Sequence, residues 1–279
     1  CFYLEMIFLV NYINYFGVFM KEWVLILGAS TGHGGATAKK LAKEGYGIIG
    51  FHFDRGEAKK EAETTISMVK DYSNNRCHYW NTNAASEEAI NKYIPKIKEI
   101  TDGEPIKLLL HSIAFGTTTN FFGEKPVTQR QMDMTIHVMG NSLLYWTQGL
   151  YSEGLLKNKS KILGLTSEGN YLAMDGYGPV SVAKVAMEAI IRQIGWELGS
   201  EGITANAIQA GITPTRALTK ITDNWEHWVK STESRNPMRR TTRPEDVANT
   251  VSMLLDERSN FINCSIIYCD GGEHRSGSF

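Results

Sequence analysis

Short apolar runs alternate with longer stretches of helical periodicity along most of this chain. The apolar runs cover the ranges 23–27, 47–53, 77–80, 107–111, 161–165, 204–209 and 265–269. The helical stretches cover the ranges 36–43, 57–70, 86–100, 129–151, 179–198 and 244–255. This alternation predicts an α/β fold: a single doubly wound domain in which a seven-stranded parallel sheet carries helices on both faces.

One long interval, 211–243, interrupts the alternation. Connections of this length usually have a function. Trp225, Trp228 and the segment 217–221 indicate short amphipathic helices, so we expect a substrate lid at about 212–243; a packed excursion without a function is the alternative. No linker or charge run divides the rest, which predicts one domain over residues 20–279.

The first residues are apolar and aromatic but include Glu5, Asn11 and Asn14. A membrane span needs about 20 nearly uninterrupted apolar residues, and a secretory signal needs a basic start and a small-residue cleavage site. We therefore expect neither. Because Met20 stands directly before the first apolar run, we expect it to be the natural start and residues 1–19 to be an extension without function. A peripheral membrane anchor is the alternative.

Composition narrows the classes of partner. The 279 residues are 42% hydrophobic, which excludes a disordered chain. A formal net charge of -1 gives no global basic field, so nucleic acid is not an expected partner. Cys1, Cys77, Cys264 and Cys269 lack CxxC or Cys/His spacing, which predicts no metal site, no disulfide framework and a reducing compartment, the cytoplasm.

A glycine-rich segment, Gly28-Ala-Ser-Thr-Gly32-His-Gly34, directly follows the run 23–27 and leads into a helix. Glycines are required where a backbone turns sharply and passes close to a pyrophosphate, whose charge lies at the helix N-terminus. The segment therefore predicts a dinucleotide site and a Rossmann-type fold. Ser30 and Thr31 can add hydroxyl bonds to phosphate or ribose.

The residues after the second apolar run bear on the choice of cofactor. An acidic side chain here would hold the ribose 2′-hydroxyl of NAD, whereas an arginine would bind the 2′-phosphate of NADP. The chain offers both, as Asp54 and Arg55. Counting from the glycines places His52 or Phe53 at the usual acidic position and leaves Arg55 free. We expect NADPH, with NADH as the alternative.

Tyr177 and Lys184 are the candidate catalytic pair. Pro179 suits a first helical turn, so Tyr177 should lie just before the helix and Lys184 on its second turn, where both can serve one site. A phenol can donate to a carbonyl oxygen during hydride transfer if a nearby ammonium lowers its pKa from about 10. Lys184 can do that and bind the nicotinamide ribose. An ordinary packed Tyr and a surface Lys are the alternative.

Together these motifs resemble the short-chain dehydrogenase/reductase superfamily over residues 20–272. The glycine turn, the helix bearing Lys184, Asn206-Ala-Ile-Gln-Ala-Gly211 and Asp270-Gly-Gly272 carry the resemblance. Within the superfamily, the chain is most similar to the enoyl-acyl-carrier-protein reductases of bacterial fatty acid synthesis.

Departures from the usual superfamily motifs point to that family. Most members place the active Tyr four residues before the Lys, where this chain has Val180; Tyr177 instead matches the Tyr-x6-Lys spacing of enoyl reductases. His111-Ser-Ile-Ala-Phe115 replaces Asn-Asn-Ala-Gly, and Ala210-Gly211 replaces Pro-Gly. Ser167 stands where the commonest enoyl reductases have an extra Tyr, which is similar to their NADPH-using branch.

The resemblance implies roles for individual residues. Tyr177 would bond the thioester carbonyl, Lys184 would hold the ribose, and Met139 replaces a catalytic Asn of other members. The residues implied to line the dinucleotide are Gly28, Ser30, Thr31, Gly32, Gly34, Arg55, Asn83, Ser112, Ile113, Ala114, Lys184, Gly211, Thr213 and Thr215. The candidates for the substrate pocket are Phe115, Ser167, Tyr171, Tyr177 and Ala217. A homotetramer is also implied.

The expected function is NAD(P)H-dependent reduction of trans-2-enoyl thioesters, carried by acyl carrier protein or CoA, in type II fatty acid biosynthesis. The alternatives are another short-chain reductase, acting on the carbonyl of a 3-oxoacyl thioester or on enoyl-CoA, and a noncatalytic NADP(H)-sensing protein. An acidic carrier protein would suit a basic landing site formed by Lys220, Arg239, Arg240 and Arg243; an ordinary solvated surface is the alternative.

Overall fold

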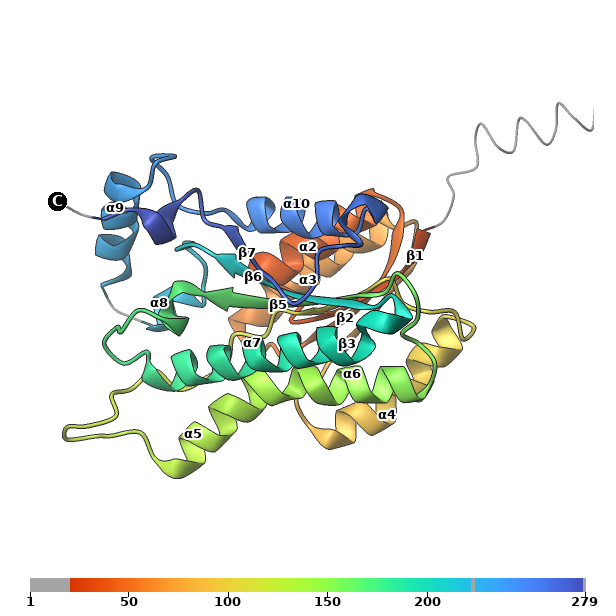
Figure 1. Ribbon diagram of the computed structural model, residues 1–279, viewed down its shortest axis with the longest axis horizontal. Helices are drawn as coiled ribbons and strands as arrows, with labels where there is room; N and C mark the ends of the chain where they lie inside the picture. The colour runs from red at the N-terminus through yellow and green to blue at the C-terminus, as the bar shows by residue number, and fades with distance from the viewer. Residues whose placement is uncertain (1–20, 222–223, 278–279) are drawn as a thin grey trace, which may run out of the picture.

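The computed structural model describes residues 21–221 and 224–277 (Figure 1), so the expectation for residues 1–19 lies outside the described residues. In this part of the chain, a seven-stranded parallel sheet has the order β3-β2-β1-β4-β5-β6-β7. The chain builds outward from β1 to β3 and then returns to β4 on the other side of β1. Ligands of such sheets bind at this reversal, outside the carboxyl ends of the strands. The predicted doubly wound fold is confirmed.

The strands lie close to the predicted apolar runs. They are β1 (Lys21–Leu27), β2 (Tyr46–His52), β3 (Cys77–Asn81), β4 (Leu108–His111), β5 (Lys161–Ser167), β6 (Thr204–Ala210) and β7 (Ile266–Cys269). Every residue of β2, β4 and β6 is buried. Because helices cover both faces of a parallel sheet, its inner strands are buried on both faces; β1 and β4 are mostly apolar, whereas β6 also buries Thr204, Asn206 and Gln209.

Helices cover both faces of the sheet, as Figure 1 shows. Those on one face are α2 (Gly32–Lys43), α3 (Glu57–Tyr72) and α10 (Pro244–Leu254), and those on the other are α4 (Glu87–Ile100), α6 (Ser142–Ser152) and α7 (Gly178–Leu198). The sheet has a hydrophobic core on each face, and successive residues of β1 point to opposite cores. Val24 and Ile26 face the first set of helices, whereas Leu25 and Leu27 face the second. This alternation follows from the two-residue repeat of a strand.

The helix expected over 129–151 is present, but it includes a π-helical turn. It consists of α5 (Gln129–Ile136), a π-helical turn (His137–Asn141) and α6. The hydroxyl of Ser142 donates to the carbonyl oxygen of Val138 and lies 2.8 Å from Nε2 of His111. Hydrophobic periodicity continues through such a turn and so does not predict it.

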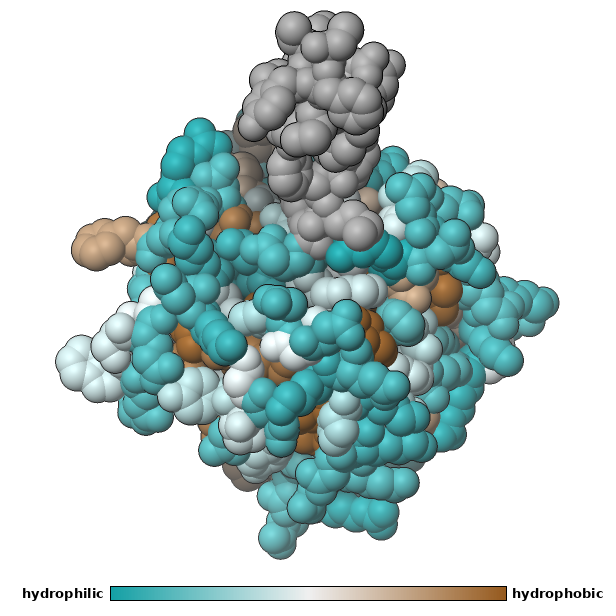
Figure 2. All heavy atoms as spheres, turned by 90° about the vertical axis from the view of Figure 1, so that its right-hand side faces the viewer, coloured by the Kyte–Doolittle hydropathy of each residue, from teal (hydrophilic) through white to brown (hydrophobic). Residues whose placement is uncertain are grey.

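The face on which the strands begin is drawn in Figure 2 and is mostly hydrophilic, with small, separate hydrophobic areas. None of the helices in the described ranges combines the length and the apolar composition that a membrane crossing requires. Most buried apolar side chains instead lie in the two layers between the helices and the sheet.

Candidate active site

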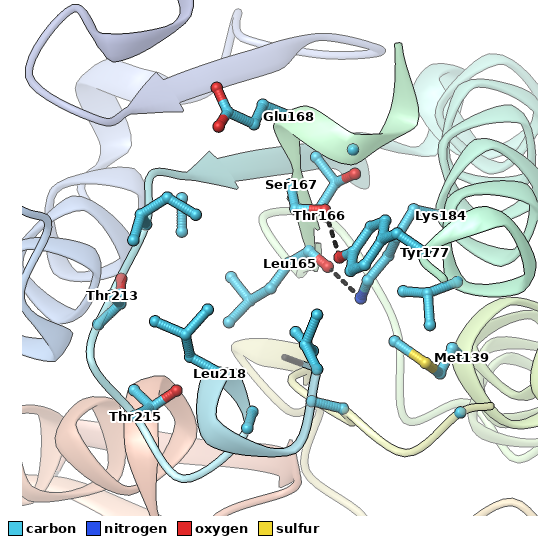
Figure 3. A pocket seen from close by; sticks show the side chains of 18 of the residues that line it. Met139, Leu165, Thr166, Ser167, Glu168, Tyr177, Lys184, Thr213, Thr215 and Leu218 are labelled. Carbon is cyan, nitrogen blue, oxygen red and sulfur yellow. Dashed lines mark hydrogen bonds between the residues drawn. The ribbon is translucent and has the colours of Figure 1, made fainter. Parts of the chain in front are cut away.

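A cavity of about 270 Å³ lies beyond the carboxyl ends of β4, β5 and β6 (Figure 3). Its wall is formed by the segments that follow β4, β5 and β6 and by the start of α7. The predicted site residues that line it are Ser112, Ile113, Ala114, Phe115, Ser167, Tyr177, Lys184, Gly211, Thr213, Thr215 and Ala217. The cavity thus brings together most of the predicted substrate residues and part of the predicted cofactor residues.

Tyr177, Ser167 and Lys184 meet in this cavity. Tyr177 is the N-cap residue of α7, Lys184 lies on its second turn, and Ser167 ends β5. The hydroxyl oxygens of Tyr177 and Ser167 are 2.8 Å apart, and Nζ of Lys184 donates to the carbonyl oxygen of Leu165 at 2.6 Å (Figure 3). The placement expected from Pro179 is confirmed, and because Lys184 is buried, the alternative of a surface lysine is wrong.

The protonation states differ from the sequence-based hypothesis. Burial raises the pKa of Tyr177 above its ordinary value, although the hydrogen bond with Ser167 acts in the opposite direction. Burial also lowers the pKa of Lys184 to about 8, opposed by the charge of Glu188. The expectation that Lys184 would leave Tyr177 with a lowered pKa is therefore wrong. At neutral pH Tyr177 is a neutral phenol, which can donate a hydrogen bond.

The glycine turn forms a tight cradle beside this cavity. Gly28 and Gly32 have φ values of 92° and 53°, a region that favours glycine. A Cβ atom on Gly28 would lie 2.5 Å from the carbonyl oxygen of Ser112, and one on Gly34 would lie 1.9 Å from that of Gly28. Side chains would therefore fill the space between the turn and the segment after β4. The cradle opens at the N-terminus of α2, where backbone N–H groups favour an anion.

The remaining predicted residues do not line the cavity. Those of the turn, Gly28, Ser30, Thr31, Gly32 and Gly34, adjoin it through the cradle. Arg55 and Asn83 lie farther along the sheet edge: the Arg55 guanidinium is 4.6 Å from the ring centre of Phe53, and Oδ1 of Asn83 accepts from the N–H of Ala85.

Tyr171 is not a cavity residue in this structure. Its hydroxyl accepts from Nε2 of Gln209 at 3.3 Å, and its side chain is 51% exposed. It directly follows the three-residue helical turn Glu168–Asn170, of which Glu168 and Gly169 do line the cavity. The expectation that Tyr171 would line the substrate pocket is therefore wrong.

Sequence reasoning missed several polar or flexible cavity residues, three of which lie close to predicted ones. His33 lies inside the glycine motif, Glu168 follows Ser167, and Met174 precedes Tyr177. Their positions beside predicted residues were visible in the sequence. The directions of their side chains were not, because these depend on the backbone turns that the segments adopt.

Two short helices occupy the expected lid, α8 (Leu218–Ile221) and α9 (Trp225–Arg235). Leu218, Ile221 and Trp228 line the cavity. Short helices beside the pocket agree with the expectation from the apolar positions. That this segment acts as a substrate lid stays a prediction.

Arg235, at the end of α9, forms ion pairs that link α9 to residues outside the expected lid. Its Nη2 donates to Oε1 of Glu273 at 2.7 Å and to Oε1 of Glu168 at 3.1 Å. Oε2 of Glu273 also accepts from the backbone N–H of Ile212. Burial and the charge of Glu168 raise the pKa of Glu273 to about 7, while Arg235 opposes this increase.

The four basic residues of the expected landing site differ in their surroundings. Lys220, Arg239 and Arg243 are exposed. Arg240 instead forms a two-point ion pair with Asp246, with distances of 2.6 and 3.0 Å. Its guanidinium is therefore already engaged, and the other three residues are better placed to meet an acidic partner.

Metal and disulfide chemistry receive no support from the described ranges. Within 21–221 and 224–277, no group of three or more His, Cys, Asp or Glu side chains is arranged to hold a metal ion. Cys77, Cys264 and Cys269 are free thiols, and Cys264 is exposed.

Comparisons with known proteins identify the family of this chain. A family model described as "Enoyl-(Acyl carrier protein) reductase" matches residues 28–274. The enoyl-[acyl-carrier-protein] reductase [NADH] FabI of Bacillus subtilis is 30% identical over 60% of this chain and 64% of its own length. Enoyl-[acyl-carrier-protein] reductase [NADH] 1 of Rhizobium meliloti is 31% identical over 62% of each chain. The chain therefore matches less than two thirds of the length of these relatives.

A solved structure supports the fold independently. It is described as an enoyl-(acyl-carrier-protein) reductase from Anaplasma phagocytophilum in complex with NAD. It aligns with a TM-score of 0.77 and 19% identity over 92% of this chain and 93% of that one. At this identity the similarity establishes the shared fold alone.

Proposed function

Because the chain belongs to the enoyl-(acyl carrier protein) reductase family of the short-chain dehydrogenase/reductase superfamily, we propose that it reduces trans-2-enoyl thioesters to acyl thioesters with NADH or NADPH. The observation that carries this proposal is the meeting of Tyr177, Ser167 and Lys184 in one cavity beside the glycine cradle. The acyl group would be carried by acyl carrier protein or CoA, and the reaction would belong to type II fatty acid synthesis in the cytoplasm.

The residues present fit a nicotinamide dinucleotide. The glycine cradle leaves room for a diphosphate at the N-terminus of α2, and Lys184 and Thr215 face the adjoining cavity. When bound, the reduced cofactor supplies the hydride. Arg55 is the residue that would meet a 2′-phosphate and supports NADPH, whereas the names of the two similar relatives specify NADH. Both cofactors therefore belong to the proposal.

Tyr177 would act on the thioester carbonyl. The hydroxyls of Tyr177 and Ser167 share a hydrogen bond in which either oxygen can donate, and with Ser167 as the donor the proton of Tyr177 is free to point at the carbonyl oxygen. Reduction adds a hydride at the β-carbon and a proton at the α-carbon, and negative charge develops on the carbonyl oxygen between these events. A fixed donor in a site that excludes water stabilises this charge more strongly than the uncharged carbonyl.

Lys184 would position the cofactor. With a pKa of about 8 its ammonium is charged at neutral pH and has three N–H donors, one of which is used by Leu165. The other two can bind ribose hydroxyls. The apolar side chains of Phe115, Leu218 and Trp228 form the part of the wall that suits an acyl chain.

The proposal includes the homotetramer that the family resemblance implies, and exposed apolar side chains are candidates for its contacts. Val182, Val185 and Trp196 lie on α7 and are exposed, and Phe261 is exposed just before β7. Burying such side chains against further copies of the chain would remove them from water. An acidic carrier protein would approach through Lys220, Arg239 and Arg243.

Parallel assays test the proposed reaction. Purified protein is mixed with NADH or NADPH and with either a crotonyl or an acetoacetyl thioester, and cofactor oxidation is measured. We expect turnover with crotonyl thioester. Turnover with acetoacetyl thioester alone would instead identify a carbonyl reductase, and cofactor binding without any turnover would identify a noncatalytic sensor.

Replacing Ser167 with Ala should have a moderate effect. The variant removes the hydrogen bond that orients the Tyr177 hydroxyl but leaves the phenol in place. A single neutral hydrogen bond contributes about 0.5–1.5 kcal/mol, so kcat should fall by roughly two- to tenfold. Steady-state kinetics with crotonyl thioester provide the measurement, and an unchanged kcat would remove Ser167 from the proposed mechanism.

A further inference from the structure

Glu188 is a buried carboxylate near the cavity that the proposed mechanism leaves without a role. It lies on α7, one helical turn after Lys184. Its Oε1 accepts hydrogen bonds from the hydroxyl of Thr166 and from Nδ2 of Asn170, the latter at 2.5 Å. Thr166 lies near the end of β5, and Asn170 ends the helical turn that follows this strand. One carboxylate oxygen therefore joins α7 to both sides of the intervening segment.

The segment between these two donors contacts Tyr177. Residues 167–169 all line the cavity. The hydroxyl oxygens of Ser167 and Tyr177 are 2.8 Å apart (Figure 3). The backbone at Gly169 lies so close to the phenol ring that a Cβ atom there would be 2.2 Å from Cε1 of Tyr177. A side chain that holds both ends of this segment therefore determines how the segment meets the phenol.

The same carboxylate acts on the lysine of the site. Burial lowers the pKa of Lys184 to about 8, and the charge of Glu188 acts in the opposite direction. Nζ of Lys184 donates to the carbonyl oxygen of Leu165, the residue that precedes Thr166. Glu188 is thus linked to both members of the candidate catalytic pair, although it does not line the cavity.

Building on the proposed reductase function, we infer that Glu188 is a positioning residue for the reaction: by accepting from Thr166 and Asn170, it holds residues 167–169 in the conformation that orients the Tyr177 hydroxyl. Because Glu188 lies behind this segment, it acts on the reacting thioester only through the residues in front of it. Loss of the carboxylate frees both ends of the segment and with them the hydroxyl of Ser167.

Two substitutions separate the hydrogen bonds of Glu188 from its charge. Glu188→Gln keeps Oε1 as an acceptor for both donors and removes the charge, whereas Glu188→Met removes the charge and the acceptor. The assays are run at pH 6, well below the pKa of about 8 of Lys184, so that this ammonium stays charged when the charge of Glu188 is lost. Turnover of crotonyl thioester with NADH is measured.

Glu188→Met should lower kcat by about two- to tenfold, the range expected when the hydrogen bond between Ser167 and Tyr177 is lost. KM for NADH should change less than kcat. Glu188→Gln should retain most of the wild-type kcat, because its amide oxygen still accepts from both donors. Glu197→Met is the matched control, since Glu197 lies on the same helix but is exposed, and its kcat should equal that of the wild type.

A double-mutant cycle with Ser167→Ala tests the route of the effect. If Glu188 acts through Ser167, adding Glu188→Met to the Ser167→Ala variant should change kcat little further. Unfolding temperatures of all variants are measured in parallel, because a purely structural role would lower them without this coupling. If Glu188→Met does not fold, Thr166→Val takes its place in the cycle, since it removes one of the two donors and keeps the branched side chain of a strand residue.

The outcomes separate this inference from the proposed function. Coupled losses, with kcat retained in Glu188→Gln, support it. Losses that multiply, equal losses in both Glu188 variants, or a wild-type kcat in Glu188→Met overturn the positioning role and leave the reductase proposal intact. Turnover of acetoacetyl thioester alone would overturn the proposed reaction, and the same cycle with that substrate would decide the role of Glu188. Absence of any turnover by the wild type would overturn both.

Discussion

Replacing Tyr177 with Phe is expected to reduce kcat for a trans-2-enoyl thioester by about 100- to 1,000-fold, which is the usual effect of removing one preorganised donor to a developing oxyanion. The variant keeps the aromatic ring, which packs against Gly169 and fills the wall of the cavity. It loses the hydroxyl that Ser167 orients. Because the donor acts most strongly when charge develops, kcat should fall more than KM rises.

The matched control for this substitution is Tyr171→Phe. Tyr171 lies only a few residues away, but its hydroxyl bonds Gln209 and its side chain does not line the cavity. We expect its kcat to remain at the wild-type value. Binding of NADH, measured by fluorescence, should be unchanged in both variants. Near wild-type turnover by Tyr177→Phe would contradict the assigned role of the phenol.

The sheet and the placement of Tyr177 and Lys184, the candidate catalytic pair, were predictable because local rules determine them. A strand buried on both faces of a parallel sheet favours apolar residues, and Pro179 sets the start of α7, which places Tyr177 and Lys184 on consecutive parts of one segment. The glycine turn was equally predictable because its positive φ values and close backbone contacts restrict the residue type.

Properties that depend on packing between distant segments were not predictable. The pKa of Tyr177 rises because several segments bury it, and spacing to Lys184 alone pointed in the opposite direction. The pairing of Arg240 with Asp246 depends on the backbone between them.

Arg235→Met is expected to lower the free energy of unfolding by about 3–5 kcal/mol at pH 8, because removing one partner of a buried ion pair leaves charge without compensation. Two carboxylates would be affected. Glu273 is fully buried, and Glu168 is nearly so. Both accept a hydrogen bond from the same guanidinium nitrogen. Urea unfolding followed by tryptophan fluorescence measures the change.

The size of this loss should depend on pH in a defined direction. With a pKa of about 7, native Glu273 binds a proton between about pH 4.5 and 7 that the unfolded chain does not, so its contribution to stability falls as pH rises through this window. The positive charge of Arg235 lowers the pKa of Glu273. In Arg235→Met this charge is absent, so the pKa of Glu273 should be higher than in the wild type. Wild type and variant should therefore differ least near pH 5.5, where Glu273 is protonated in both, and most at pH 8.

Arg258→Met is the control for the loss of an arginine in itself. Arg258 pairs with Asp256 on the surface and is largely exposed, so its replacement should change stability little at either pH.

Arg235→Met should also raise KM for the enoyl thioester. Trp228 of α9 lines the cavity, and the substitution removes the ion pairs that hold α9 to Glu168 and Glu273. A loss of stability that is equal at pH 5.5 and 8 would show that Glu273 does not titrate in this range. An unchanged KM would show that the ion pairs of Arg235 contribute to stability without positioning α8 and α9 at the cavity.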